Sequence, residues 1–418
     1  MNNPIVKRYY LAVKAKLLAP LLVSNGDSYY SDVDVIRNGD GELFVPGTSL
    51  AGAMRGFLGK KPEENCLMGY SRGNEGKMSS LFFSDAYFEK SSDSMVSVRD
   101  GICLQDDKTV KPGGKYDYQI VETGAVCTFY LEYIKRKYSA EDEWKQVFQM
   151  LRGVQAGDIR FGTKKNRGFG RLRIEHVYKA EFDASSREQW LEFQKAGREV
   201  FCTDKYEYFS WDGEYEPRYV SIKIPLRLEG GISIRRYSAI DGKADYEHIT
   251  CAGDPVIPGT SWNGAIRARA QRILLELGCK DVENKLNQWF GYVKEKEAQQ
   301  SFLIFGESVL KDGTKMLSTR NRINRFDAST VEGALYSEEA YFGGTTMLEI
   351  KIPKSEEKNY KAAAGLMLLV ADEIRNGYLA VGGQTAVGRG IFNGDSGPIQ
   401  INDFLDRNEC MQELAQIV

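Results

Sequence analysis

The chain has 418 residues, a length that fits two domains better than a single core. Hydrophobic residues make up 42% and charged residues 27%, a globular balance that excludes intrinsic disorder and fibrous structure. Because the formal net charge is −2, the chain as a whole gives no support to nucleic-acid binding. Any such function must depend on local clusters of basic residues.

The cysteines exclude two further classes. Seven cysteines are an odd number, they form no CxxC pair, and only two histidines accompany them. We therefore expect neither a structural zinc site nor a disulfide framework. Apolar runs are too short for a membrane span, and no basic and then apolar signal segment opens the chain. A cytoplasmic protein with no membrane partner is expected.

The chain repeats itself in order. Strand-like stretches with alternating apolar residues begin at Arg8 and Arg218. PGTS recurs at Pro46 and Pro258, and SLFFSDAYF is matched by SFLIFGESVL. A glycine-rich turn near the end of each half holds a GxG pair, at Gly168/Gly170 and at Gly388/Gly390. The spacing between copies drifts only from 210 to 220 residues, which predicts a duplicated domain over 1–180 and 215–418, with a helix-containing linker over 181–214.

Each half alternates strands with two helices. The helices are predicted over Ser49–Gly59, Ala140–Arg152, Thr260–Gly278 and Ala362–Arg375. The Thr-Ser pairs of PGTS are expected to cap the first and third helices. This order predicts the α+β class: two tandem ferredoxin-like domains, each an antiparallel sheet with helices on one face.

The glycine-rich turns are candidate phosphate sites, because glycines let backbone amides approach a phosphate closely. Basic residues surround both copies, whereas neither copy fits GxGxxG or the Walker pattern, so a dinucleotide or ATP site is not expected. The alternative is that the glycines only form a tight turn. The candidate RNA-binding residues in the turns are Lys164, Lys165, Arg167, Gly168, Gly170, Gly388, Arg389 and Gly390.

Further basic candidates lie on the PGTS helices and in an inserted hairpin. The free amide end of a helix can hold an anion, and Arg55 and Arg267 on these helices could meet an RNA backbone. Arginines on a solvated helix face are the structural alternative. Charged, glycine-punctuated stretches from Arg99 and Arg320 predict a projecting hairpin in each half. In the second hairpin the candidates are Arg320, Arg322 and Arg325.

A polar loop before each PGTS carries an aspartate, Asp32 in the first half and Asp245 in the second. A carboxylate beside a phosphate backbone disfavours binding, so we interpret both as recruiting a divalent metal or deprotonating a ribose 2′-hydroxyl. Loop aspartates also make turns, and the rivals in these loops are Asp27, Asp34 and Asp241.

The two histidines do not recur at matching places in the two halves. His248 follows Asp245 by three residues, but Val35 stands at the matching place after Asp32. A paired-histidine mechanism common to both halves is excluded, and His248 is interpreted as a local contact.

With these motifs the chain resembles the RAMP superfamily of CRISPR-associated proteins, most closely the backbone subunits of type III effector complexes. The stretches that carry the resemblance are FVPGTSLAGAMRGFL, VIPGTSWNGAIRARA, NRINRFDASTVEGALYSEEAYFGGT and the turns at 162–170 and 382–390. The resemblance implies an RRM-like fold, guide-RNA binding along a filament, and a hairpin thumb that interrupts the guide–target duplex. It also implies partners: guide RNA, target RNA and other effector subunits.

In such subunits the cleaving aspartate precedes the PGTS-like motif, the place of Asp32 and Asp245 here. The resemblance thus implies catalysis at both residues, with a divalent metal, Mg²⁺ by expectation, held by the same two carboxylates. The tandem form and the acidic balance depart from the family pattern. Three alternatives stay open: a non-catalytic RNA scaffold, a guide-processing ribonuclease of the same superfamily, and a small-molecule enzyme on duplicated ferredoxin-like domains.

Overall fold

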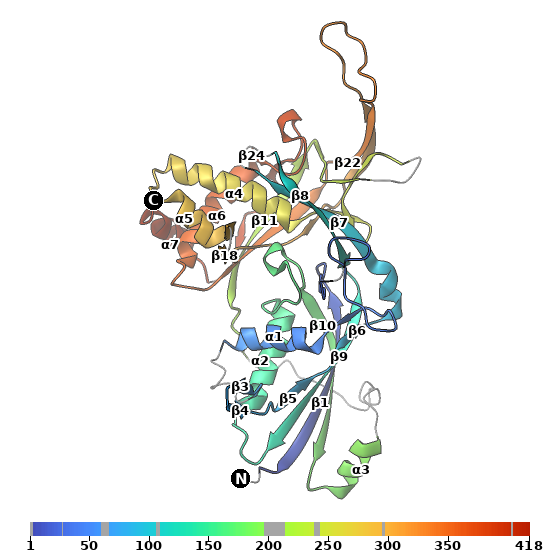
Figure 1. Cartoon of the computed structure of the whole chain (residues 1–418). Helices are drawn as coiled ribbons and strands as arrows, with labels where there is room; N and C mark the ends of the chain where they lie inside the picture. Colours follow the sequence, from blue (N-terminus) through green and yellow to red (C-terminus); the bar gives the residue numbers. More distant parts are fainter. Residues whose placement is uncertain are drawn as a thin grey trace. The chain divides into compact units, whose positions relative to one another are not determined.

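In a computed structural model of the chain, two compact units are formed, Met1–Lys165 with Phe169–Pro217, and Asn166–Gly168 with Arg218–Val418 (Figure 1). Each unit is described by itself. The residues that the structure describes are 3–26, 28–59, 67–105, 109–195, 214–237, 243–294, 297–402 and 404–418.

The sheet of the first unit is centred on β1 (Ile5–Leu17), whose apolar positions alternate as the sequence predicts. Strands β9 (Val126–Arg136) and β10 (Leu172–Asp183) pair antiparallel with its two edges. Both β5 (Leu81–Phe83) and β6 (Ala86–Phe88) pair with β9. The short β2 (Phe44–Val45) pairs with β6. Side chains at alternate positions of β1 are buried in one core: Leu11, Val13, Ala15 and Leu17.

Two helices complete that core. Helix α1 (Gly47–Leu58) contributes Leu50 and Met54, and α2 (Glu143–Ala156) contributes Met150 and Leu151. Their apolar residues recur at helical spacing, so each helix buries one side against the sheet.

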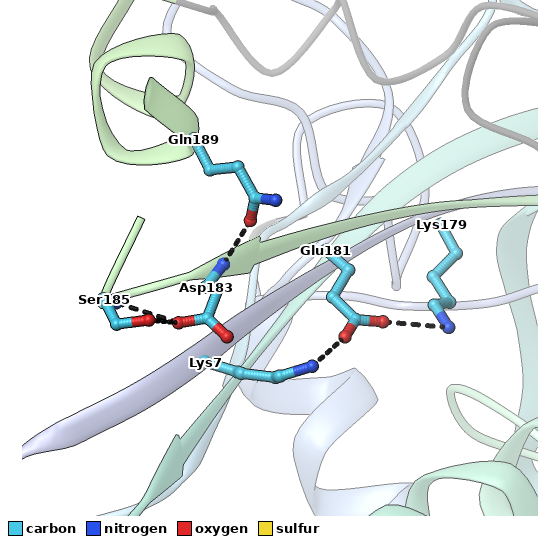
Figure 2. A network of polar contacts seen from close by, with 6 residues as sticks. All are labelled: Lys7, Lys179, Glu181, Asp183, Ser185 and Gln189. Atoms are coloured by element: carbon cyan, nitrogen blue, oxygen red, sulfur yellow. Dashed lines mark hydrogen bonds and ion pairs between the residues drawn. The ribbon is translucent and has the colours of Figure 1, made fainter. Parts of the chain in front are cut away.

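A third helix, α3 (Arg187–Lys195), lies within the predicted linker and packs on the first unit through Phe193, which contacts Tyr10 and Phe182. Figure 2 shows the polar contacts where α3 begins: Asp183 accepts hydrogen bonds from Ser185 and its backbone N–H donates to Gln189. Beside them, the Glu181 carboxylate forms ion pairs with Lys7 Nζ, at 2.6 Å, and with Lys179 Nζ, at 3.4 Å. The linker helix is therefore joined to the first sheet.

The second unit is built in the same way around β11 (Tyr219–Glu229). Strands β23 (Thr345–Pro353) and β25 (Ile391–Gly394) pair antiparallel with β11, and β19 (Ile304–Phe305) extends the sheet from β23. The remaining strands of this sheet are β24 (Asn376–Ala380) and β26 (Gln400–Ile401). Its helices are α4 (Gly259–Glu276), α5 (Val282–Phe290), α6 (Tyr360–Arg375) and α7 (Arg407–Ala415), all of which contribute to one core.

Each unit carries the predicted hairpin. In the first, β7 (Val96–Leu104) pairs with β8 (Val110–Val121). In the second, β21 (Thr314–Arg320) pairs with β22 (Tyr336–Phe342), and Figure 1 shows the orange turn between them extending away from the rest of its unit. Strands β12 (Gly231–Ile232), β13 (Arg235–Tyr237) and β14 (Tyr246–His248) join β22 in a small sheet.

Short elements complete the chain. The remaining strands are β3 (Tyr70–Arg72), β4 (Glu75–Lys77), β15 (Thr250–Cys251), β16 (Asp254–Ile257), β17 (Tyr292–Lys294), β18 (Glu297–Gln299) and β20 (Ser308–Val309). The 3₁₀ turns are η2 (Lys90–Met95), η3 (Lys165–Arg167) and η5 (Thr385–Val387). Within the described part of the chain, none of the helices has the length and apolar content that crossing a membrane requires.

The α+β class and the four predicted helices are confirmed, but the predicted Thr-Ser caps are wrong. Helices α1 and α4 begin at Gly47 and Gly259, so Pro46 and Pro258 are the N-cap residues, and neither makes a side-chain hydrogen bond to its helix. Both glycines lie close to other backbone: a Cβ would lie 2.9 Å from the Ser84 carbonyl oxygen at Gly47 and 2.1 Å from the Phe305 carbonyl oxygen at Gly259. At Gly47 the backbone N–H donates to Asp85 Oδ1 at 2.7 Å, so a carboxylate of the same unit already occupies that amide.

Candidate functional site

In the first unit the exposed Asp32 is fixed to the hairpin base, meaning the paired strands of a hairpin (β7 with β8, β21 with β22) as distinct from the turn between them. Its backbone N–H donates to Asp117 Oδ1 at 2.7 Å, and its Oδ2 accepts from the Asp117 backbone N–H at 2.9 Å. Asp117 belongs to β8, 85 residues further along the chain. This reciprocal pair gives the Asp32 carboxylate a defined position at the surface.

Asp245 is held in the same way in the second unit. Its Oδ2 accepts from the Ser337 backbone N–H at 2.7 Å and from the Ser337 hydroxyl at 3.0 Å, while its own N–H donates to Ser337 Oγ at 3.1 Å. These hydrogen bonds, first from the backbone and then from the hydroxyl, lower the pKa of Asp245. The carboxylate is therefore ionised at neutral pH, as a cation-binding group must be.

The two pairs occupy equivalent places, because Asp117 on β8 and Ser337 on β22 are 220 residues apart, like the glycine-rich turns. The rival Asp34 differs. It is buried, and its carboxylate accepts from the backbone of Tyr29 and Tyr30 and from the Ser31 hydroxyl, which makes it a turn-forming residue. The other rivals, Asp27 and Asp241, lie outside the described residues.

The donor set suits a cation that the substrate helps to bind. No group of three His, Cys, Asp or Glu side chains is placed to hold a metal within the described ranges. Each site offers one exposed carboxylate, with the Asp117 carboxylate or the Ser337 hydroxyl beside it. Mg²⁺ is commonly bound by one or two carboxylates, substrate phosphate oxygens and water, so Asp32 and Asp245 fit that role.

The glycine-rich turns are closed by identical bonds in the two units. The Phe161 and Val381 N–H groups donate to the carbonyls of Gly170 and Gly390, both at 2.9 Å. The amides of these glycines in turn donate, at 2.8 Å, to carbonyls that follow the first strand of each unit. The amides of Gly170 and Gly390 thus stabilise the turn itself. Phosphate contact by the other predicted turn residues, Lys165, Arg167, Gly168 and Gly388, stays a prediction.

The turn also reaches the hairpin in both units. Lys164 and Gln384 are 220 residues apart and share a left-handed backbone, with φ of 54° and 57°. Lys164 Nζ donates to the Tyr116 hydroxyl on β8 at 2.9 Å, and Arg320, at the end of β21, donates to Gln384 Oε1 at 3.1 Å. The Arg389 guanidinium lies 4.4 Å from the ring centroid of Phe342 on β22. The structure thus brings Lys164, Arg320 and Arg389 to the hairpin bases.

Arg55 and Arg267 make hydrogen bonds within their own units. Arg55 donates to the carbonyls of Met68 and Gly69, and Arg267 donates to the Gly291 carbonyl and to Asn287 Oδ1, all within 3.0 Å. Arg55 thus ties α1 to residues 68–69, and Arg267 ties α4 to the C-terminal end of α5. RNA contact by these two arginines stays a prediction, as it does for the exposed Arg322 and Arg325 at the turn of the second hairpin.

Replacing Arg267 by Ala is expected to lower the free energy of unfolding by about 2–3 kcal/mol, because two charge-assisted hydrogen bonds are lost and a buried carbonyl is left without its donor. The matched control is Arg272→Ala, an exposed arginine of the same helix, with an expected change within about 0.5 kcal/mol. Urea denaturation of both variants measures the difference. Equal midpoints for the two would contradict the structural role of Arg267.

His248 is a local contact, as predicted. Its side chain is 3% exposed, its Nδ1 accepts from the Ile234 N–H and its Nε2 lies 3.1 Å from the Val256 carbonyl. Burial lowers the pKa of His248 to about 4. A neutral, enclosed imidazole with both nitrogens engaged cannot reach RNA.

This burial predicts a pH dependence of stability. The pKa of His248 is about 4 in the fold and about 6.5 in the unfolded chain, so protonation favours unfolding. The contribution of the neutral His248 to the free energy of unfolding is fully present above about pH 6.5. It falls by about 3 kcal/mol as the pH approaches 4. His248→Asn should flatten unfolding curves between pH 6.5 and 4.5. If the wild type and the variant lose stability in parallel over that range, the assignment is wrong.

Several side chains of the site are not among the residues that the sequence predicts. They lie on strands that pair at the hairpin bases, and a Tyr recurs at equivalent places on β8 and β22. The 220-residue spacing relates Tyr116 to Tyr336 and Asp117 to Ser337, so the repeat is the sequence signal for these four residues. The missed residues are Tyr116, Asp117, Arg235, Tyr336, Ser337 and Glu338.

Comparison with known proteins agrees with this geometry. The model of the RAMP superfamily matches residues 14–173 and 242–393, and each match contains one aspartate loop, one PGTS helix, one hairpin and one glycine-rich turn. No curated protein matches the chain. Membership of this superfamily suggests a CRISPR-associated, RNA-binding role. With two matches that together cover most of its length, the chain belongs to the RAMP superfamily as a tandem pair of its domains.

Proposed function

We propose that the chain is a guide-RNA-binding backbone subunit of a type III CRISPR effector complex and cleaves target RNA at two sites, one in each repeat. One observation carries the proposal: an exposed aspartate tied to a hairpin base recurs once in each matched region, as Asp32 with Asp117 and as Asp245 with Ser337. Equivalent carboxylates in both copies favour two equivalent reactions over a single site.

We infer that each repeat is a ferredoxin-like, RRM-like domain. Four strands of the first sheet pair in the order β10-β1-β9-β5, and four strands of the second sheet pair in the order β25-β11-β23-β19, with every pair antiparallel. Counted along the chain among these four, they are the fourth, first, third and second strands, and a helix follows the first and the third. This arrangement supports an open sheet that can present RNA to the hairpin.

The chemistry proposed for Asp32 and Asp245 is attack by a ribose 2′-hydroxyl, which gives its proton to the carboxylate, on the adjacent phosphate. The bond from phosphorus to the 5′-oxygen of the next nucleotide breaks, and that oxygen takes a proton from water, which leaves a 2′,3′-cyclic phosphate and a 5′-hydroxyl. At each site a divalent metal, Mg²⁺ by expectation, would be held by the aspartate of that repeat together with RNA oxygens, and it would supply positive charge for the phosphate and the attacking oxygen. The hydrogen bonds from Asp117 and Ser337 fix the orientation of each carboxylate. Lys164, Arg320 and Arg389, at the hairpin bases, would attract the phosphate backbone.

The test uses the full chain in a complex assembled with guide RNA, and a complementary target RNA labelled at one end. Two cuts are expected in Mg²⁺ and none when EDTA removes the metal. Two cuts that persist in EDTA would contradict the metal-dependent mechanism.

A second candidate function, a non-catalytic scaffold, is favoured by one observation: Asp245 Oδ2 already accepts two hydrogen bonds from Ser337, as a structural carboxylate would. If the chain is such a scaffold, target RNA in the same experiment stays bound to the complex and is not cut. A guide-processing ribonuclease would instead cut precursor repeat RNA without metal, and retention of no RNA at low salt would revive a small-molecule enzyme.

A further inference from the structure

The two faces of each hairpin base carry different chemistry. Successive residues of a strand point to opposite faces, so Asp117 lies on one face of β8, and Tyr116 and Tyr118 lie on the other. On β22, Ser337 is separated from Tyr336 in the same way. Contacts agree with this alternation, because Asp32 contacts Asp117 whereas Lys164 contacts the two tyrosines.

On the face opposite Asp32, a cation and aromatic rings form one cluster. The rings of Tyr116 and Tyr118 are stacked, with centroids 5.7 Å apart. Lys164 Nζ lies 4.9 Å and 4.2 Å from these centroids and donates a hydrogen bond to the Tyr116 hydroxyl, which fixes its position. Tyr118 is 5% exposed, whereas Tyr116 is 37% exposed. A partly exposed ring is thus held in place by a buried neighbour and a cation.

The second unit repeats this arrangement with other residues. The Arg235 guanidinium lies 4.8 Å from the ring centroid of Tyr246 and 5.9 Å from that of Tyr336. The two rings meet edge to face at 6.1 Å. Arg235 forms an ion pair of 2.8 Å with the buried Glu338 of β22, which fixes the position of its guanidinium. An aromatic ring beside a fixed cation therefore recurs at the place equivalent to Tyr116.

Rings and cations in this arrangement are what proteins use to bind unpaired nucleotides: the base stacks on the ring, and the cation attracts the phosphate. A purely structural pair would not need a partly exposed ring at the same position in both repeats. We propose that Tyr116 in the first repeat and Tyr336 in the second each stack an unpaired RNA base, on the face opposite the aspartate. This inference rests on the proposed RNA-binding function and assigns holding and cutting to different faces of the hairpin.

The first test is photo-cross-linking of the wild-type full chain to single-stranded RNA in which every uridine is 5-iodouridine. A stacked halogenated base cross-links to the ring that it contacts, so we expect mass spectrometry to find adducts at Tyr116 and Tyr336. The wild-type protein is used, so the result does not depend on whether a variant folds.

The second test measures RNA affinity in a salt titration. The double variant Tyr116→Ala/Tyr336→Ala should bind about 5- to 100-fold more weakly. The double variant Tyr116→Phe/Tyr336→Phe keeps both rings and should stay within about threefold of the wild type. The matched control is Tyr138→Ala/Tyr378→Ala, at tyrosines that are 65% and 69% exposed, the first with Lys137 Nζ 5.7 Å from its ring. Its affinity should be unchanged.

The outcomes separate the two proposals. If the wild type retains no RNA at low salt, the proposed function fails, and this inference fails with it. If the wild type binds RNA but adducts form elsewhere and the Ala double variant binds like the control, only the stacking sites are overturned.

Discussion

Replacing Asp32 and Asp245 together by Asn is expected to slow target-RNA cleavage roughly 10²- to 10⁴-fold while RNA affinity stays within about twofold. Asn is nearly the same size, and its side-chain oxygen can still accept from the N–H groups of Asp117 and Ser337. The hairpin bases therefore keep their hydrogen bonds, and the main change is the loss of two negative charges. The cleavage rate falls because the reaction requires a negatively charged carboxylate at each site.

Single-turnover rates with saturating protein measure this effect without interference from binding. The control is Asp40→Asn/Asp312→Asn, which removes two exposed aspartates from turns outside the site and should leave the rate unchanged. If the site variant and the control cleave at the same rate, the two carboxylates have no part in the chemistry.

Replacing Gly390 by Ala is expected to be among the most destabilising single changes in the second unit, at about 3 kcal/mol or more. Gly390 has a φ of 72°, and a Cβ there would lie 1.8 Å from the Val381 carbonyl oxygen, which is backbone and cannot move aside without opening the turn. The hydrogen bonds that close the turn, Val381 N–H to Gly390 and Gly390 N–H to Gly231, would be lost with it.

Gly388 provides the matched control for this prediction. It has a similar φ of 81°, but a Cβ there would meet nothing within 4 Å. Gly388→Ala should therefore cost only about 1–2 kcal/mol of backbone strain. Thermal unfolding of the two variants separates close contact from strain, and equal losses of stability would show that the tight turn is not what Gly390 provides.

The repeated architecture is predictable from the sequence because it depends on local patterns. Alternating residues predict β1 and β11, helical spacing predicts α1 and α4, and the recurrence of GxG predicts two equivalent turns. These signals need only neighbouring residues, and the duplication lets each copy check the other.

What the sequence does not reveal depends on contacts between distant residues. The partner of Asp32 is 85 residues away and the partner of Asp245 is 92 residues away, and only strand pairing brings them together. The Thr-Ser cap predicted for α1 is wrong for the same reason. Asp85, between β5 and β6, accepts from the Gly47 amide, and the helix begins at Gly47, before Thr48 and Ser49. Whether Arg55 faces solvent or a carbonyl is likewise decided by the fold around its helix.

The most direct test of two equivalent catalytic sites is a cleavage map of end-labelled target RNA with the single variants Asp32→Asn and Asp245→Asn. The account predicts two cuts for the wild type, loss of one cut in the first variant, and loss of the other cut in the second. Retention of both cuts in each variant, or loss of both cuts from either change alone, would contradict one independent active site per repeat.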